Sequence, residues 1–208
     1  IAKDILYIDA PDAYDRRAIQ TVFYEVMVKL TKLLTPVIPH TAEEIWEYLN
    51  EDEEFVQLTE MPEVEKYENR EEVLEKWHAF MDLRDNILKA NEVARENKVI
   101  GKDFEAKLTL YVTDGVKELF ESLDADLRQI LVASELNVLP MADKPEGDDS
   151  LLEFNTMSIK VEHMPGGVCD RCRITTEELI EVEDKGTLCT RCHDIVEEHY
   201  PELLADAE

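Results

Sequence analysis

The chain has 208 residues, of which 44% are hydrophobic, so it can bury a core in one large domain or in two or three small ones. Its 49 acidic and 22 basic residues give a net charge of −27, which argues against a surface built throughout for phosphate binding. The sequence contains neither a long apolar run nor a signal-peptide pattern, so a cytosolic protein with reduced thiols is expected. The first residue is Ile1 rather than Met, which suggests a fragment or a processed product.

The first predicted helix covers residues 15–35, where apolar side chains recur at helical spacing and form one wide face. A lead-in over residues 1–14, which alternates weakly and ends in an Asp/Pro cluster, precedes it, with Asp12 or Asp15 as the expected helix cap. Pro36 ends this helix.

A second, shorter helix is predicted to open with a capping box formed by Thr41 and Glu44, and to bury Trp46. An acidic surface loop over residues 50–68 follows it. The third helix, about 69–97, has Asn69 and Glu72 as its expected cap pair, and apolar residues on one face, among them Trp77. Both tryptophans lie on apolar faces, so core packing is favoured over base stacking. The three helices predict a small bundle over residues 1–101.

The hydrophobic period changes after Gly101. Residues 106–113 alternate as a strand does, and residues 115–132 indicate two short helices around Asp124. Short strands at 136–139 and 152–163 flank a turn-rich loop. These elements predict a small mixed α/β unit over residues 102–164, and the segment Pro165-Gly-Gly is expected to link it to a C-terminal unit over 165–208.

All four cysteines of the chain lie near its C-terminus, in the pairs Cys169-x-x-Cys172 and Cys189-x-x-Cys192. This spacing is typical of a closed tetrahedral zinc site, so one structural Zn²⁺ ion is predicted. Residues 173–188 are long enough for two strands, with Lys185-Gly186 as the turn signal. Two disulfides are the alternative interpretation, and His193 or His199 as a replacement ligand is a further one.

Basic residues form two candidate groups for nucleic-acid contacts. The first consists of Arg171, Arg173 and Arg191, which lie in or beside the cysteine turns and are expected to project outward together. The alternative role for these arginines is charge compensation, because four thiolates and Zn²⁺ leave a charge of −2. The second group lies along and just past the third helix and consists of Arg84, Lys89, Arg95, Lys98 and Lys102. Of these, Arg84, Lys98 and Lys102 could follow a phosphate backbone, although a solvated helix face is the simpler interpretation.

The acidic charge is unevenly distributed along the chain. Residues 51–75 hold eleven acids and two bases and contribute −9, whereas residues 84–107 hold six bases and five acids, a local +1. Surface fields are screened within about 8–10 Å, so an acidic protein can still present a locally basic face. The sequence shows no phosphate-binding glycine loop and no nucleophile beside a recognisable base, so no catalytic residue is predicted.

Two segments resemble a known family. LLTPVIPHTAEEIWEYL (33–49) is similar to the helical anticodon-binding domain of class Ia aminoacyl-tRNA synthetases. LRDNILKANEVARENKVIGKDFEAKLTLYV (83–112), together with the four-cysteine unit, resembles the C-terminal end of bacterial-type isoleucyl-tRNA synthetases. The resemblance covers essentially the whole chain. It implies a mainly α, multi-domain fold: an anticodon-binding helical bundle, a small α/β unit and a four-cysteine zinc knuckle.

The resemblance also implies a function. The chain is expected to bind the anticodon stem-loop of isoleucine tRNA, while N-terminal catalytic and editing domains of the same polypeptide carry out ATP-dependent aminoacylation. The HIGH and KMSKS motifs of that catalytic domain are absent here, so the fragment alone is expected to be an inactive, monomeric, cytoplasmic part of the ligase. Cys169, Cys172, Cys189 and Cys192 match the zinc ligands of the family and Arg171 its basic turn residue. Arg173 stands where the family usually has an aromatic residue.

Two other classes of protein remain as alternatives. One is a DNA-binding module like the zinc knuckle of formamidopyrimidine-type DNA glycosylases, although the N-terminal Pro-Glu start of those enzymes is missing. The other is a zinc-stapled protein-interaction module with an acidic surface. Measurable affinity for isoleucine tRNA at low salt would separate these classes.

Overall fold

The structure is a computed structural model that describes residues 2–182 and 185–204. Contacts between Cα atoms divide the chain into two compact units. The first, which we call the helical unit, covers Ala2–Glu68, and the second, the sheet unit, begins at Asn69. No helix in the described part of the chain is long and apolar enough to cross a membrane.

The helical unit contains α1 (Ala2–Ile8), α2 (Tyr14–Leu34), α3 (Pro39–Trp46) and a 3₁₀ turn, η1 (Val56–Leu58). Its small core forms where α3 meets η1 and α2, and consists of Ala42, Trp46 and Val56 with Val28 and Leu49 against them. The Trp46 indole nitrogen donates a hydrogen bond to the Glu53 carbonyl at 2.7 Å, so the acidic loop is tied to the core.

The predicted helix starts need correction. The weakly alternating lead-in over residues 1–14 contains a helix, α1, and α2 is preceded by Ala13 as its cap rather than by Asp12 or Asp15. Helix α3 begins at Pro39, two residues before the predicted cap at Thr41. Proline fixes φ near the helical value and needs no N–H partner at the first helical position, so the helix can start there without a side-chain cap.

The wide apolar face predicted for residues 15–35 is present on α2 but is exposed within the helical unit. Its exposed residues are Val22, Phe23, Val26, Leu30 and Leu33. The periodicity therefore identified the helix correctly, whereas the covering partner implied by that face is not among the elements of this unit.

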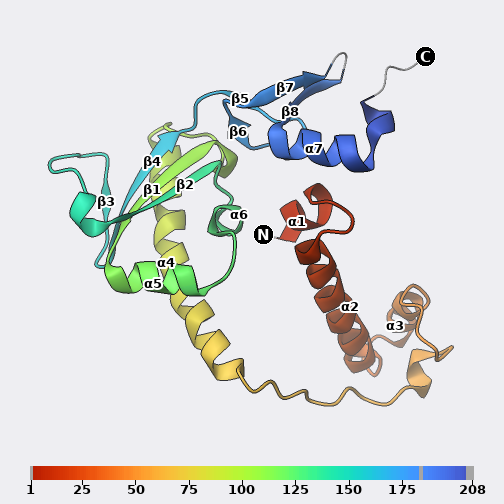
Figure 1. The fold of residues 1–208 in the computed structure, drawn as a ribbon. Coiled ribbons are helices and arrows are strands. Elements are labelled where there is room, and N and C mark those ends of the chain that lie inside the picture. Colours follow the sequence, from red (N-terminus) through yellow and green to blue (C-terminus); the bar gives the residue numbers. More distant parts are fainter. Residues whose placement is uncertain (1, 183–184, 205–208) are drawn as a thin grey trace. The chain divides into compact units, whose positions relative to one another are not determined.

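The sheet unit begins with α4 (Arg70–Glu96) and a four-stranded sheet in the order β2-β1-β4-β3 (Figure 1). The strands are β1 (Ala106–Val112), β2 (Glu135–Pro140), β3 (Leu152–Glu153) and β4 (Met157–His163). Strands β1 and β2 are parallel and are joined through α5 (Asp114–Ser122) and α6 (Leu127–Leu131), while β4 is antiparallel to β1 and β3. The strands predicted at 106–113 and 136–139 and the two short helices are thus confirmed, whereas the strand predicted over 152–163 is divided into β3 and β4, which pair with each other.

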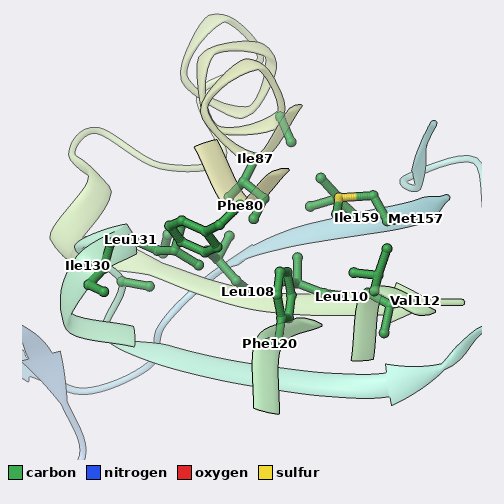
Figure 2. Close-up of a cluster of buried hydrophobic side chains, with 14 of the residues drawn as sticks. Phe80, Ile87, Leu108, Leu110, Val112, Phe120, Ile130, Leu131, Met157 and Ile159 are labelled. Carbon is green, nitrogen blue, oxygen red and sulfur yellow. The ribbon is translucent and has the colours of Figure 1, made fainter. Parts of the chain in front are cut away.

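Helix α4 packs on this sheet through the C-terminal part of its apolar face (Figure 2). Phe80 and Ile87 are fully buried among residues of β1 and β4, and the Phe80 ring meets the ring of Phe120 from α5 edge to face at 6.0 Å. The predicted boundary at residue 101 therefore differs from the division at 68/69 that contacts give. The reason is that the third helix covers the sheet rather than belonging to the same compact unit as α2 and α3.

The C-terminal part of the sheet unit holds two small hairpins and a helix. Strands β5 (Gly167–Val168) and β6 (Thr175–Thr176) pair antiparallel, as do β7 (Leu179–Val182) and β8 (Gly186–Cys189). Helix α7 (Thr190–His199) and a 3₁₀ turn, η4 (Pro201–Leu203), follow. The two strands predicted within residues 173–188 are confirmed, and Gly186 has a positive φ of 101° beside the turn. Residues 183 and 184 of that turn lie outside the described residues.

Candidate metal centre and nucleic-acid interface

Four short elements bring the cysteine sulfurs together. Cys169 follows β5, Cys172 lies in the turn after it, Cys189 ends β8, and Cys192 lies in the first turn of α7. All four side chains are buried, and none forms a disulfide. The two-disulfide alternative is therefore wrong for this structure.

The sulfur positions fit a tetrahedral metal ion. The four Sγ atoms lie within 4.8 Å of one another, and the Sγ atoms of Cys172 and Cys189 are 3.7 Å apart. A tetrahedron with Zn–S bonds of about 2.3 Å has sulfur–sulfur edges of about 3.8 Å. The donor set is thus chemically and geometrically suited to a closed, thiolate-bound ion, and none of its four positions is left for water.

Hydrogen bonds hold the two cysteine turns in register. In the first turn, the Cys169 amide donates to the Ile174 carbonyl at 2.9 Å and the Arg173 amide donates to the Cys169 carbonyl at 2.9 Å. Asp170 connects this turn to the second one, because its amide donates to the Thr187 carbonyl at 2.8 Å and its carboxylate accepts the Thr187 amide at 2.9 Å. A side chain at Gly186 would meet the Asp170 carboxylate, since an added Cβ would lie 2.4 Å from its Oδ2.

The packed sulfurs have strongly altered acidities. The hydrogen bond from Cys172 lowers the pKa of the Cys169 thiol far below its usual value. The same bond raises the pKa of Cys172, and the neighbouring Cys169 sulfur raises that of Cys192. The cluster therefore stabilises a thiolate by sharing the remaining protons, and these protons must leave when a metal ion binds.

The three arginines of the first basic group differ in their exposure and contacts. Arg171 turns inward, and its guanidinium donates to the Cys192 sulfur at 3.7 Å, so it does not project outward as expected. This contact favours the charge-compensation alternative for Arg171. Arg173 has a side chain 64% exposed and pairs with Asp170 at 3.4 Å, and Arg191 is half-buried. Arg173 also has a positive φ of 69°, in the left-handed region.

The second basic group is gathered only in part. Lys98 and Lys102 are both exposed and lie on the turn that follows α4, where Lys98 has a positive φ of 59°. The Glu105 carboxylate accepts the amides of Gly101 at 2.7 Å and of Lys102 at 3.2 Å, which fixes the shape of this turn. Arg84 lies in α4 fourteen positions before Lys98, about 20 Å along the helix axis. Its Nε is buried without a hydrogen-bond partner, so Arg84 is less available to an external phosphate.

Sequence reasoning missed two features of this region. His193, Asp194 and Glu197 of α7 lie close together, with the His193 ring 3.8 Å from Asp194 and 3.9 Å from Glu197. The i, i+4 spacing on a helix was the available signal. Neither His193 nor His199 belongs to the four-sulfur group. The second missed residue is Asp170, and its role depends on a contact seventeen residues away that no local pattern reports.

Residues 1–110 match a family model described as the anticodon-binding domain of tRNA ligase. This match covers more than half of the chain, so the chain belongs to the family of tRNA ligases that carry this domain.

Relatives in several bacteria are named isoleucine–tRNA ligase. The chain is 49% identical over 205 residues to the protein of Enterococcus faecalis, 50% over 204 residues to that of Lactiplantibacillus plantarum, and 52% over 201 residues to that of Lactobacillus johnsonii. These matches cover 99%, 98% and 97% of this chain but only 22%, 22% and 21% of the relatives. The chain thus spans about a fifth of the length of the curated relatives it matches.

Proposed function

We propose that this chain is the tRNA-binding C-terminal part of an isoleucine–tRNA ligase and that it recognises the anticodon stem-loop of isoleucine tRNA. The observation that carries the proposal is the near-complete match of the chain to relatives with that name, at about half identity. Because the chain covers only about a fifth of the relatives' length, activation of isoleucine with ATP and transfer to tRNA would belong to N-terminal catalytic and editing domains. The protein would act as a cytoplasmic monomer.

The metal is proposed to be one structural Zn²⁺ ion held by Cys169, Cys172, Cys189 and Cys192. Four buried thiolates at tetrahedral spacing favour Zn²⁺ over oxygen-seeking ions such as Mg²⁺ or Ca²⁺. The ion would supply no chemistry to aminoacylation, because its coordination is complete. Its role would be to fold two turns that a hydrophobic core of this size cannot hold alone.

The helical bundle predicted for residues 1–101 remains part of the proposal. Its support is the exposed apolar face of α2, together with Val73 and Leu74 of α4, which are 40% and 38% exposed. Amphipathic helices need such faces to be covered, and a bundle that includes further helices of the full-length polypeptide would cover them.

Two exposed cationic places are proposed to contact the tRNA. Arg173 sits on a turn that the metal and Asp170 hold rigid, so its guanidinium is preorganised for phosphate or for stacking on an unpaired base. Lys98 and Lys102 share one fixed turn and would follow the phosphate backbone. Arg191 and Arg84 would add contacts at the edges of these two places. Arg171 would mainly offset the negative charge of the thiolates, and its contact with tRNA would be secondary.

The proposal is tested in the full-length ligase with Arg173→Ala and with Lys98→Ala. Each variant is expected to raise the KM for isoleucine tRNA about 5- to 30-fold, which corresponds to about 1–2 kcal/mol for one charged contact. Isoleucine activation, measured by pyrophosphate exchange, should stay unchanged. The control Lys117→Ala removes an exposed lysine of α5 that pairs only with Glu121 at 3.9 Å, and it should leave the KM unchanged.

Arg171→Ala distinguishes the two roles of the knuckle arginines. Charge compensation predicts loss of bound zinc in this variant, whereas a tRNA contact alone predicts a raised KM with full zinc content. If Arg173→Ala and Lys98→Ala leave the KM for tRNA unchanged, or if they lower pyrophosphate exchange as much as aminoacylation, tRNA recognition by these residues is refuted. A protein-interaction module would then account better for the acidic surface.

A further inference from the structure

Ser134 lies at a junction of three segments of the sheet unit. It follows Val132, which ends α6 in the left-handed conformation with φ 61°, and the buried Ala133. A β-branched residue rarely adopts this conformation, and such strain persists only where the surrounding structure over-determines it. The turn at Val132 directs the chain away from α6, so that Ser134 stands directly before β2.

The backbone and side chain of Ser134 bind two different parts of the unit. Its amide donates to the Ala106 carbonyl at 3.0 Å, and its hydroxyl donates to the Phe104 carbonyl. The same hydroxyl accepts the amide of Thr175 at 2.9 Å. The Ser134 hydroxyl oxygen thus connects the segment before β1 with β6. Thr175 of β6 lies 41 residues after Ser134 in the chain.

Thr175, which donates its amide to Ser134, lies beside the four-cysteine cluster. Thr175 is buried, and it pairs with Val168, the residue before Cys169. The side-chain oxygen of Thr175 is buried without a hydrogen-bond partner, so the contact to the sheet runs through its backbone amide rather than its hydroxyl. A fixed Thr175 therefore holds the β5–β6 pair from which the first cysteine turn emerges.

On its other side, Ser134 contacts the segment that follows the turn with Lys98 and Lys102. Phe104 and Ala106 flank Glu105, whose carboxylate holds the amides of Gly101 and Lys102. The Glu105 carbonyl also accepts the amide of Met164, at the end of β4, at 2.7 Å. The segment 101–106 is thus fixed on both sides, and Ser134 joins it to the cysteine turns through a single side chain.

We propose that Ser134 is a positioning residue for tRNA, which sets the cysteine turns and the Lys98–Lys102 turn at a fixed spacing so that both bind the same tRNA. This inference rests on the proposed function and deepens it. Two contacts at a fixed spacing bind one ligand with a smaller loss of conformational entropy than two contacts that move independently, because their relative orientation is already set in the free protein. Loss of the Ser134 hydroxyl would free the β5–β6 pair without touching a metal ligand or a cation.

The test uses the full-length ligase with Ser134→Ala, the hydroxyl-preserving Ser134→Thr, and Thr175→Val as matched control. Thr175→Val removes a hydroxyl that has no partner and keeps the amide that Ser134 accepts. Ser134→Ala is expected to accelerate hydrogen exchange at the Thr175 amide and to raise the KM for isoleucine tRNA about 3- to 10-fold. The kcat, pyrophosphate exchange and zinc content should not change. Ser134→Thr and Thr175→Val should stay within about twofold of the unmodified enzyme.

Three outcomes overturn the inference. The first is faster exchange at Thr175 with an unchanged KM, which makes the hydrogen bond structural only. The second is an equal rise in KM for Ser134→Ala and Ser134→Thr, and the third is loss of zinc or of isoleucine activation in Ser134→Ala, which would make Ser134 a folding residue. Failure of the proposed function is recognised separately, because Arg173→Ala and Lys98→Ala would then also leave the KM unchanged.

Discussion

Single residues differ in how well their roles can be read from the sequence. The spacing of Cys169, Cys172, Cys189 and Cys192 predicts their convergence, because two C-x-x-C turns have few other uses. The inward direction of Arg171 could not be predicted, since any arginine in such a turn has several rotamers and the Cys192 sulfur competes with water for it. Ser134 and Asp170 were missed because their partners lie 41 and 17 residues away.

Glu105 provides a pH-dependent prediction. The hydrogen bond from the Gly101 amide, and then that from Lys102, hold the pKa of this carboxyl below its usual value. Its stabilising contribution is therefore complete above the unfolded-state pKa of about 4.3 and is lost as the pH falls through the lower folded-state pKa. Glu105→Gln should lower the free energy of unfolding of the sheet unit at pH 7, and the difference from the unmodified chain should shrink below about pH 4.

Urea unfolding between pH 7 and pH 3, followed by Trp77 fluorescence in a Trp46→Phe background, measures this difference. Glu118→Gln is the control, because Glu118 is an exposed residue of α5 and its replacement should not change stability at pH 7. If the difference in the free energy of unfolding between Glu105→Gln and the unmodified chain stays constant over the whole pH range, the carboxylate charge is not the source of the effect.

The hydrophobic periodicity predicted which helices and strands exist better than it predicted where each begins and what it packs against. The 3.6-residue pattern of α2 and α4 and the alternation of β1 were sufficient to predict these elements. The pattern does not say what covers an apolar face, so it could not show that Phe80 and Ile87 of α4 pack on the sheet. The start of α3 was misplaced because Pro39, whose φ suits the first helical position and which has no N–H to pair, begins the helix without the Thr41 capping box.

Phe80→Ala tests the packing of α4 on the sheet. The Phe80 ring is fully buried and contacts Trp77 edge to face at 5.6 Å as well as Phe120 at 6.0 Å. Its removal leaves a cavity between helix and sheet and should lower the free energy of unfolding of the sheet unit by about 3–5 kcal/mol. Met81→Ala, one position along and 41% exposed, should cost under about 1 kcal/mol. Urea unfolding monitored by circular dichroism compares them, and equal losses would refute the packing.

The whole molecule combines an acidic surface with two locally cationic turns. With a net charge of −27, the proposed recognition of tRNA would depend on a few well-placed cations rather than on the overall charge. Placement in turn depends on rigid supports, which here are the sulfur cluster with Asp170 and the Glu105-bound turn. The helices, most strands and the convergence of the four cysteines could be predicted from the sequence, whereas these supports depend on long-range hydrogen bonds.

Removal of the metal should affect the two compact units differently. The four cysteines and Trp77 belong to the sheet unit, whereas Trp46 is buried in the helical unit and bonded to Glu53. Chelation is expected to unfold the cysteine turns, to shift the unfolding of Trp77 to lower urea through the Ser134–Thr175 contact, and to leave the transition of Trp46 unchanged. The helical signal in circular dichroism should persist, because α2 and α4 contain no metal ligand.

Single-tryptophan chains, Trp77→Phe and Trp46→Phe, report the helical and the sheet unit separately in a urea titration with and without chelator. Re-addition of Zn²⁺ is the control and should restore the Trp77 transition, since the donor residues are intact. Simultaneous loss of both transitions and of the helical signal on chelation would contradict independent units. An unchanged Trp77 transition would instead show that the cysteine turns fold and unfold independently of the sheet. The hydrogen bond at Ser134 would then not couple their stabilities.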